Sequence, residues 1–148
     1  SIPVAELLDY LKDHDVKSAR DLCTKSGGFV SLLGTADLKE VTAVRIPTGD
    51  AAAARAWDAM IYQIVKHIGM MSTVLKGKVD GILLGGGLVH NADLVQKIEV
   101  ACSWIAPVSA YPGEFELEAM AAGAIRVLSG VETAREYTGV PRWNGFPD

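Results

Sequence analysis

Hydrophobic positions recur at helical spacing through the middle of the chain. From Ala51 to Lys76 the apolar residues return every three or four positions, which places them on one face of a helix: Trp57, Met60, Ile61, Ile64, Ile68, Met71 and Leu75. Asp50 or Thr48 can cap the start of this helix, and Gly77 ends it. The pattern therefore predicts one long central helix.

The first 50 residues carry only short helical patterns, which we interpret as helical segments that lead into the long helix. Ser18, with Asp21 three residues later, loosely resembles a capping box that opens one such segment. Thr35 can cap another segment that begins near Asp37. An apolar stretch near Phe29 is a candidate for a short strand.

After the long helix, short apolar runs alternate with helical patterns. Val79–Leu84 is apolar or small apart from one acid and lacks strict alternation, which is typical of a strand buried on both faces of a parallel sheet. Asn91 can cap the helix that follows, and a second strand is expected within Trp104–Tyr111. Pro112–Gly113 then turns into a last helix that Gly130 ends. This order predicts a parallel βαβ unit.

Two strands alone would leave both edges of this sheet unpaired, and parallel sheets normally have more strands and two covered faces. We therefore expect the chain to be part of something larger. Within the chain, residues 1–50 would be helical segments that lead into the long helix, and residues 51–138 would form the long helix and a βαβα nucleotide-binding core. Residues 139–148, which show no period, would be a surface tail.

Composition and charge exclude several classes of protein. The chain has 148 residues, 49% of them hydrophobic and 22% charged, which fits one folded domain. Its net charge is -4 and it has no run of Lys or Arg, so we expect no nucleic-acid partner. No apolar stretch approaches the roughly 20 residues that span a bilayer, and the N-terminus is unlike a signal peptide, so we expect no membrane partner. Cys23 and Cys102 are expected to be free thiols of a cytoplasmic protein, with a single disulfide as the alternative.

Three consecutive glycines, Gly85–Gly87, follow the first predicted strand. Parallel sheets place ligands at the carboxyl ends of their strands, where glycines let a ligand approach the backbone closely. The helix that starts after Asn91 adds free N–H groups, which favour an anionic or hydrogen-bond-accepting ligand. A dinucleotide fingerprint would need a glycine in place of His90, and no Gly-Lys-Ser/Thr follows as in a P-loop. A tight turn without a ligand is the alternative.

Two further clusters could bind a ligand. Glu114 and Glu118 share a face of the last predicted helix, and acids in a first turn either complement the helix dipole or support a phosphate-bound metal through water. Thr35 and Asp37 could hydrogen-bond a ribose or a base edge, or they could serve only as helix caps. The three histidines lack the spacing of metal ligands.

At these loops the chain resembles the C-terminal part of the acetate and butyrate kinase family. The matching stretches are GGFVSLLGTADLKEV, AWDAMIYQIVKHIGMMSTVLKGKVDGILLGGGLVHN and WIAPVSAYPGEFELEAMAAGAIRVLSGVETAREY. They run in family order from about Ser26 to Tyr137, and the spacing of the glycine and Pro-Gly-Glu loops favours the butyrate kinases. The resemblance implies an α/β fold: a partial ribonuclease-H-like lobe of the actin-like ATPase type, with a short parallel βαβ sheet covered by several helices.

The resemblance also implies an activity and its ligands. The reaction is phosphoryl transfer from ATP to butanoate, giving ADP and butanoyl phosphate, with Mg²⁺ as cofactor and a homodimer as the assembly. The implied nucleotide-binding residues are Asp37, Leu38, Lys39, Gly86, Gly87, Leu88 and Asn91. Glu116, or alternatively Glu114, corresponds to the metal-associated glutamate of the family.

Departures from the family limit these expectations. Gly85 stands where many relatives have Thr, and Leu38 and Lys39 stand where acetate kinases have Phe and Arg. The N-terminal lobe with its carboxylate pocket, the phosphate hairpin and the catalytic acid have no counterpart in these residues. We therefore expect no catalytic residue here and an inactive isolated chain, which keeps the nucleoside end of the site. A non-catalytic nucleotide-binding or assembly module is the alternative, and a dinucleotide-binding protein is a third.

Overall fold

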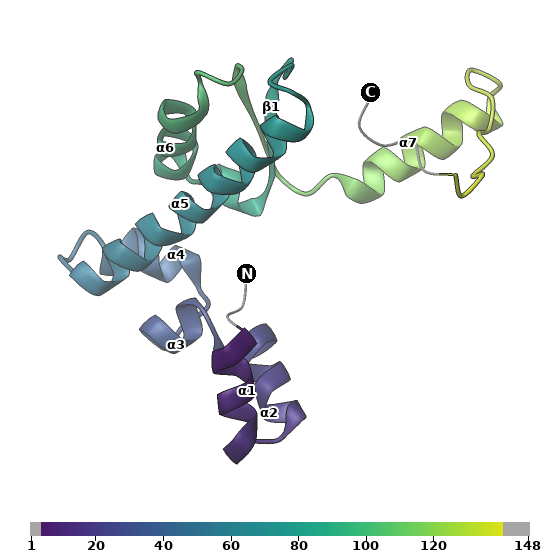
Figure 1. Cartoon of the computed structure of the whole chain (residues 1–148). Coiled ribbons are helices and arrows are strands. Elements are labelled where there is room, and N and C mark those ends of the chain that lie inside the picture. The colour runs from purple at the N-terminus through teal and green to yellow at the C-terminus, as the bar shows by residue number, and fades with distance from the viewer. Residues whose placement is uncertain (1–3, 141–148) are drawn as a thin grey trace.

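The computed structural model describes residues 4–140, in which helices pack on one face of a small two-stranded parallel sheet (Figure 1). The predicted tail at residues 139–148 lies outside the described residues except for residues 139 and 140, which have no regular structure. The first part of the chain is a series of short helices, as predicted: α1 (Val4–Asp13), α2 (Val16–Asp21), a π-helical turn (Leu22–Ser26), α3 (Phe29–Leu33), α4 (Leu38–Glu40) and a second π-helical turn (Val41–Arg45).

Three details of these short helices differ from the sequence-based predictions. The cap of α2 is Asp15, whose carboxylate accepts a 2.6 Å hydrogen bond from the Ser18 backbone N–H, so Ser18 lies inside the helix and does not cap it. The cap of α4 is Asp37 and not Thr35. The segment from Phe29 is helical and not a strand, because it can pack as one turn against the long helix that follows.

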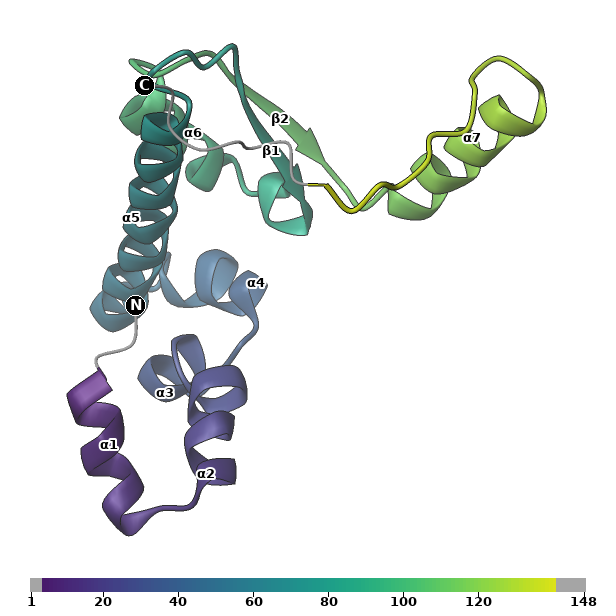
Figure 2. The same cartoon turned by 45° about the vertical axis from the view of Figure 1, so that its right-hand side comes forward.

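The predicted long helix is α5 (Ala51–Val74), which runs vertically in Figure 2. Asp50 caps it by accepting hydrogen bonds of 3.0 Å from the backbone N–H groups of Ala52 and Ala53. The Arg45 guanidinium donates to this same carboxylate at 2.8 Å and to the Leu33 carbonyl at 2.8 Å. One arginine therefore ties α3 to the start of α5.

The predicted βαβ unit is confirmed. It consists of β1 (Ile82–Gly86), α6 (Ala92–Cys102) and β2 (Val108–Pro112), and the two strands run parallel. Ile82 pairs with Val108 at one end of the ladder, and Gly86 pairs with Pro112 at the other. The strand begins later than predicted and continues through two of the glycines, because these glycines take part in the pairing with β2.

One hydrophobic core joins α5, α6 and β1, and its buried members are Trp57, Ile61, Ile82, Leu94, Ile98, Cys102 and Ala106. Burial raises the pKa of the Cys102 thiol, while Cys23 is exposed. Both cysteines are unpaired, which confirms the expectation of free thiols.

The opposite face of the sheet is open to solvent. Leu83 in β1 is 72% exposed and Tyr111 in β2 is 61% exposed, although the sequence predicts a strand that is covered on both faces. Within residues 4–140, β1 pairs with β2 alone, so both edges of the sheet lack a further strand. The described residues thus form a sheet with unpaired edges, which agrees with the two strands that the sequence predicts.

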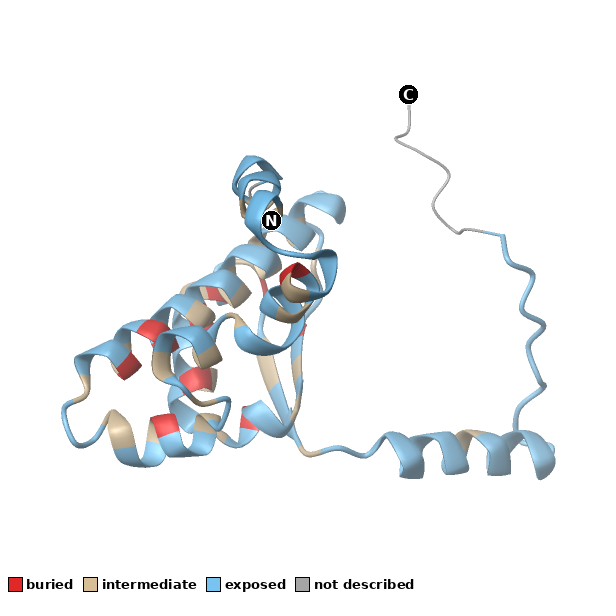
Figure 3. Cartoon of the chain, turned by 90° about the horizontal axis from the view of Figure 1, so that it is seen from below, coloured by how far each residue is buried: buried red, intermediate tan, exposed pale blue. Residues whose placement is uncertain are grey.

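The last helix, α7 (Glu116–Leu128), stands apart from the rest of the protein in every view (Figures 1, 2 and 3). It has no buried residue, and Figure 3 shows it exposed along almost its whole length. It begins and ends within a few residues of the predicted turns, since Gly113 and Gly130 both adopt the left-handed backbone conformations expected of glycine.

Candidate functional site

The carboxyl end of β1 is built from glycine backbone. Gly86 has a φ of 92°, a conformation that residues with a side chain rarely adopt, and it turns the chain into the 3-10 turn Gly87–His90. The Gly113 N–H, just beyond β2, donates to the Gly86 carbonyl at 3.4 Å. The two strand ends therefore meet at one surface to which Gly86 and Gly113 contribute backbone alone.

Helix α6 starts directly beside this surface. Asn91 caps it, because its side-chain oxygen accepts a 3.0 Å hydrogen bond from the Leu94 N–H. The free N–H groups of this first turn carry partial positive charge, which favours a negative or hydrogen-bond-accepting group nearby. The predicted cap of this helix is confirmed.

A pocket of about 500 Å³ opens between the glycine turn, the start of α6 and the α4 region, and its lining residues are Leu38, Lys39, Thr42, Ala43, Trp57, Gly87, Leu88, His90 and Asn91. The volume falls within the roughly 300–1,000 Å³ typical of small-molecule sites. It lies at the carboxyl end of a parallel strand, the position at which α/β proteins bind ligands.

The α4 side of the pocket is held in place by Asp37. Its carboxylate accepts hydrogen bonds from the backbone N–H groups of Lys39 at 2.9 Å and Glu40 at 3.1 Å. The Thr35 hydroxyl accepts from the Asp37 N–H at 3.1 Å. Asp37 therefore fixes the turn that presents Leu38 and Lys39 to the pocket.

A polar network lies under the pocket and joins α5 to α6. The indole N–H of Trp57 donates to the Asp93 carboxylate at 2.8 Å. The Lys97 ammonium lies 2.7 Å from the Asp58 carboxylate and 3.0 Å from that of Asp93. The Trp57 N–H and, after it, Lys97 hold the pKa of Asp93 below its ordinary value, while Asp58 and then Asp93 raise the pKa of Lys97. The network orients the tryptophan ring and the first turn of α6 together.

Glu114 is the acid that the structure brings to the glycine turn. Its Oε1 lies 3.6 Å from the position that a Cβ on Gly87 would occupy. Glu116 is the first residue of α7 and is exposed. Within residues 4–140 no group of three or more His, Cys, Asp or Glu side chains is arranged to hold a metal ion. Magnesium beside phosphates needs only one or two carboxylates from the protein, so a single glutamate at this position is compatible with such a site.

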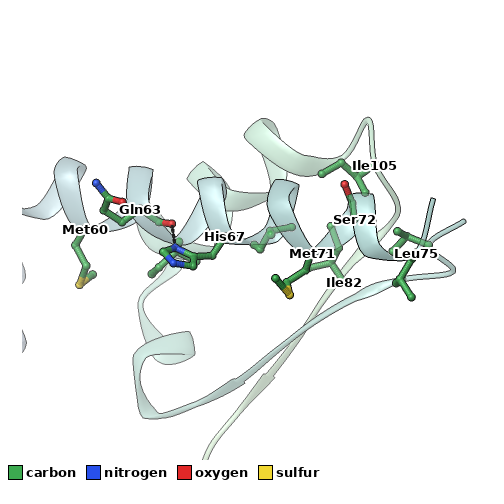
Figure 4. A pocket seen from close by; sticks show the side chains of 12 residues that line it. Met60, Gln63, His67, Met71, Ser72, Leu75, Ile82 and Ile105 are labelled. Carbon is green, nitrogen blue, oxygen red and sulfur yellow. Dashed lines mark hydrogen bonds between the residues drawn. The ribbon is translucent and has the colours of Figure 1, made fainter. Parts of the chain in front are cut away.

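A second pocket, of about 580 Å³, lies on the other side of the core and differs in chemistry (Figure 4). It is a groove between the last turns of α5 and the start of β1, and most of its lining is apolar: Met60, Ile64, Ile68, Met71, Leu75, Val79, Ile82 and Ile105. It lies at the amino end of β1, and its few polar side chains are uncharged or histidine. The lining of the groove therefore includes no Lys or Arg side chain that could pair with an anionic ligand.

Comparison with known proteins identifies the family. The acetokinase family matches residues 5–106, which is more than half of the chain. The chain belongs to the acetokinase family. This family is of the actin-like ATPase type, so the expected fold class, an α/β lobe with a short parallel sheet, is confirmed.

Three curated relatives of this acetokinase-family chain are each named a probable butyrate kinase. The protein from Listeria welshimeri is 42% identical over 139 residues, which is 93% of the chain and 39% of the relative. The protein from Clostridium botulinum is 49% identical over 111 residues, 75% of the chain and 31% of the relative. The protein from Listeria monocytogenes is 45% identical over 121 residues, 82% of the chain and 34% of the relative. The chain thus spans less than two fifths of the length of these relatives.

The pocket brings together five of the seven residues that the resemblance implies for nucleotide binding: Leu38, Lys39, Gly87, Leu88 and Asn91. Asp37 and Gly86 frame the pocket and are not part of its lining. Four further residues line the pocket and are not among the predicted ones: Thr42, Ala43, Trp57 and His90. The helical spacing of Trp57 indicates a core residue, and the structure shows it buried in the core while it also borders the pocket.

Proposed function

We propose that the chain is the nucleotide-binding part of a butyrate kinase, an enzyme that transfers a phosphoryl group from ATP to butanoate and gives ADP and butanoyl phosphate. The observation that carries the proposal is the pocket at the carboxyl end of β1. Membership of the acetokinase family and the names of the relatives support the same reaction. The adenosine half of ATP or ADP is the ligand that we assign to the pocket.

The chemistry of the lining suits a nucleoside. Leu38 and Leu88 offer apolar contact to a base from two sides, and the buried Trp57 borders the pocket from the core. Gly87 lets a ribose or base approach the backbone without interference from a side chain. The N-terminus of α6 beside Asn91 can receive an oxygen of the ribose or of the first phosphate.

Lys39 and Glu114 are the charged residues that we expect to face the phosphate side of the nucleotide. Lys39 lines the pocket and would supply positive charge. Glu114 would support Mg²⁺ through a water molecule, and the exposed Glu116 is the alternative that the resemblance favours. When bound, Mg²⁺ neutralises negative charge on the phosphates, which lowers the barrier to transfer. The residues of this chain bind and orient the nucleotide.

We further propose that the chain does not catalyse the transfer by itself. Phosphoryl transfer depends on charges positioned around the γ-phosphate, and a short carboxylate must be held in line with it. The lining of the pocket includes one ammonium side chain and no arginine. The carboxylate site would come from the part of the relatives that has no counterpart among these 148 residues.

The cellular setting is also a proposal. Two free cysteines fit a reducing compartment, and we place the protein in the cytoplasm. Among the described residues, no helix has the length and hydropathy to cross a membrane. The homodimer that the resemblance implies stays a prediction, which light scattering on the purified chain would check.

Calorimetric titration tests the proposed function. ATP and ADP should each bind the chain with one site, and NADH should bind more weakly, since the glycine turn lacks the dinucleotide fingerprint. An assay of butanoyl phosphate formation with the same sample should show no turnover above background. Absence of ATP and ADP binding would favour the assembly module, tighter binding of NADH would favour a dinucleotide site, and robust turnover would contradict the proposed inactivity.

A further inference from the structure

The side chain of Asp93 lies beside the nucleotide pocket without lining it. Its carboxylate is turned toward α5, where Oδ2 accepts a 2.8 Å hydrogen bond from the indole N–H of Trp57. Trp57 is 2% exposed and borders the pocket. Asp93 is therefore tied to a buried residue of α5 that takes part in the site.

Asp93 belongs to the first turn of α6, which begins beside the pocket at Asn91. The Asn91 side chain caps the Leu94 N–H at 3.0 Å, so the N–H groups of Ala92 and Asp93 are the ones without a partner inside the helix. These groups can donate to an oxygen of the ligand only if the turn is held in a fixed direction. The buried Leu94 holds the turn to the core on one side, and the bond from Asp93 to Trp57 holds it on another.

A smaller pocket, of about 220 Å³, lies next to this network and shares three lining residues with the nucleotide pocket: Thr42, Trp57 and Asn91. Its lining also includes the charged residues of the network. Side chains do not fill this space. On this side of the turn, the hydrogen bond between Asp93 and Trp57 therefore supplies the support that packing does not.

The charge of Asp93 is compensated within the network. A free carboxylate close to the start of α6 would repel an anionic ligand. The Lys97 ammonium, one turn further along the helix, lies 3.0 Å from the Asp93 carboxylate and 2.7 Å from that of Asp58 in α5. The same oxygen of Asp93 thus accepts from Trp57 and pairs with Lys97. This pairing directs the carboxylate to α5 and offsets its charge.

We propose that Asp93 is a positioning residue of the nucleotide site: through its bond to Trp57, it holds the first turn of α6 and the bordering tryptophan in the arrangement that receives the nucleotide. Lys97 keeps the carboxylate in place. This inference rests on the proposed binding of ATP or ADP to the pocket. It assigns a role to a side chain that lies outside the lining of that pocket.

Two variants of equal charge and similar size test the role of the carboxylate. Asp93→Asn and Asp93→Leu both remove the negative charge, but only Asn keeps an oxygen that can accept from the indole N–H. In calorimetric titrations with ADP, Asp93→Asn should bind within about twofold of the wild-type chain. Asp93→Leu should bind at least about fivefold more weakly, a size that one lost hydrogen bond accounts for. The matched control is Glu99→Leu, at an exposed acid later in α6, which should bind within about twofold of the wild type.

Two further variants separate positioning from a purely structural role. Ile98→Val loosens the buried core that α6 shares with α5 but leaves the network intact, so it should keep ADP affinity within about twofold. In the Trp57→Phe background, the Asn and Leu variants of Asp93 should differ by less than about twofold, because no indole N–H remains. A measurement without ligand and without Trp57→Phe supports this comparison: hydrogen exchange of the Trp57 indole N–H should be at least about tenfold faster in Asp93→Leu than in Asp93→Asn.

Equal ADP affinities of the Asn and Leu variants would overturn the positioning role. A loss of affinity in Ile98→Val as large as that in Asp93→Leu would do the same, as would a full difference between Asn and Leu in the Trp57→Phe background, or equal indole exchange. The affinity outcomes require a wild-type chain that binds ADP, so they leave the proposed function standing. A wild-type chain that does not bind ADP would instead refute the proposed function, and the positioning role with it.

Discussion

The indole N–H of Trp57 donates a 2.8 Å hydrogen bond to the carboxylate of Asp93, 36 positions later in the chain. Trp57 belongs to α5 and Asp93 to the first turn of α6, so this bond joins the two helices that form the core. The same tryptophan lines the candidate nucleotide pocket. The Trp57 side chain therefore packs in the core, hydrogen-bonds to α6 and borders the pocket.

Replacement of Trp57 tests this link. Trp57→Phe removes the indole donor and part of a buried ring, so we predict a loss of about 1–3 kcal/mol in the free energy of unfolding. Affinity for ADP should fall as well, because the pocket wall changes shape. The matched control is Trp104→Phe, at a tryptophan that is 78% exposed, which should change stability by less than about 0.5 kcal/mol. Equal losses in urea unfolding of the two variants would contradict the role given to Trp57.

Substitutions at Asn91 separate stability from binding. Asn91→Ala loses the cap of α6 and should cost about 1 kcal/mol of stability as well as affinity for ADP. Asn91→Asp keeps a capping oxygen and should retain stability, but its negative charge should weaken the binding of an anionic ligand. Thermal unfolding and calorimetry measure the two effects. An Asp variant that binds ADP more tightly than the wild type would be inconsistent with a phosphate near this helix end.

The two glycines of the turn should respond differently to alanine. Gly86→Ala places a side chain at a φ of 92° and should destabilise the fold by about 1–3 kcal/mol. Gly87 has an ordinary φ, and a Cβ there would meet Glu114 at 3.6 Å, so Gly87→Ala should fold normally. The larger Gly87→Val should also fold but should lose ADP affinity, because Gly87 lines the pocket. Unfolding midpoints and titrations on the three variants check this order.

The low pKa of Asp93 makes stability depend on pH. Its carboxyl binds a proton less readily in the folded chain than in the unfolded chain, where its pKa is about 3.8–3.9. The stability that the ionised Asp93 carboxylate adds to the folded chain is therefore complete above about pH 4. It is lost as the pH falls through the folded-state pKa. Because the side chain is 53% exposed, the effect should be small. Asp93→Asn should make the fall in stability below pH 4 shallower, and an unchanged slope in acid unfolding would contradict this.

The sequence predicts the parts of the fold that depend on local signals. The limits of α5, the cap Asn91 and the βαβ order follow from helical spacing, capping chemistry and glycine positions, which act over a few residues. The choice of cap in α2 and α4 was wrong, because Asp15 and Asp37 compete with nearby hydroxyl residues that the pattern favours equally.

The candidate site was predictable only in part. The resemblance supplied Leu38, Lys39 and the glycine turn, and the structure places them around one pocket. The helical period marks Trp57 as a core residue and says nothing about the neighbouring pocket. The open face of the sheet and the isolated α7 could not be read from hydrophobic patterns either, since an apolar residue indicates burial whether or not its partner is present.

The most direct test of the central claim is to map the ligand site by nuclear magnetic resonance. ADP is titrated into the ¹⁵N-labelled chain, and shifts of the backbone amides are followed. We predict the largest shifts at Lys39, Gly87, Leu88 and Asn91, which surround the pocket at the carboxyl end of β1. Shifts centred on Ile68 and Ile105 in the apolar groove, or no shifts at millimolar ADP, would contradict the account.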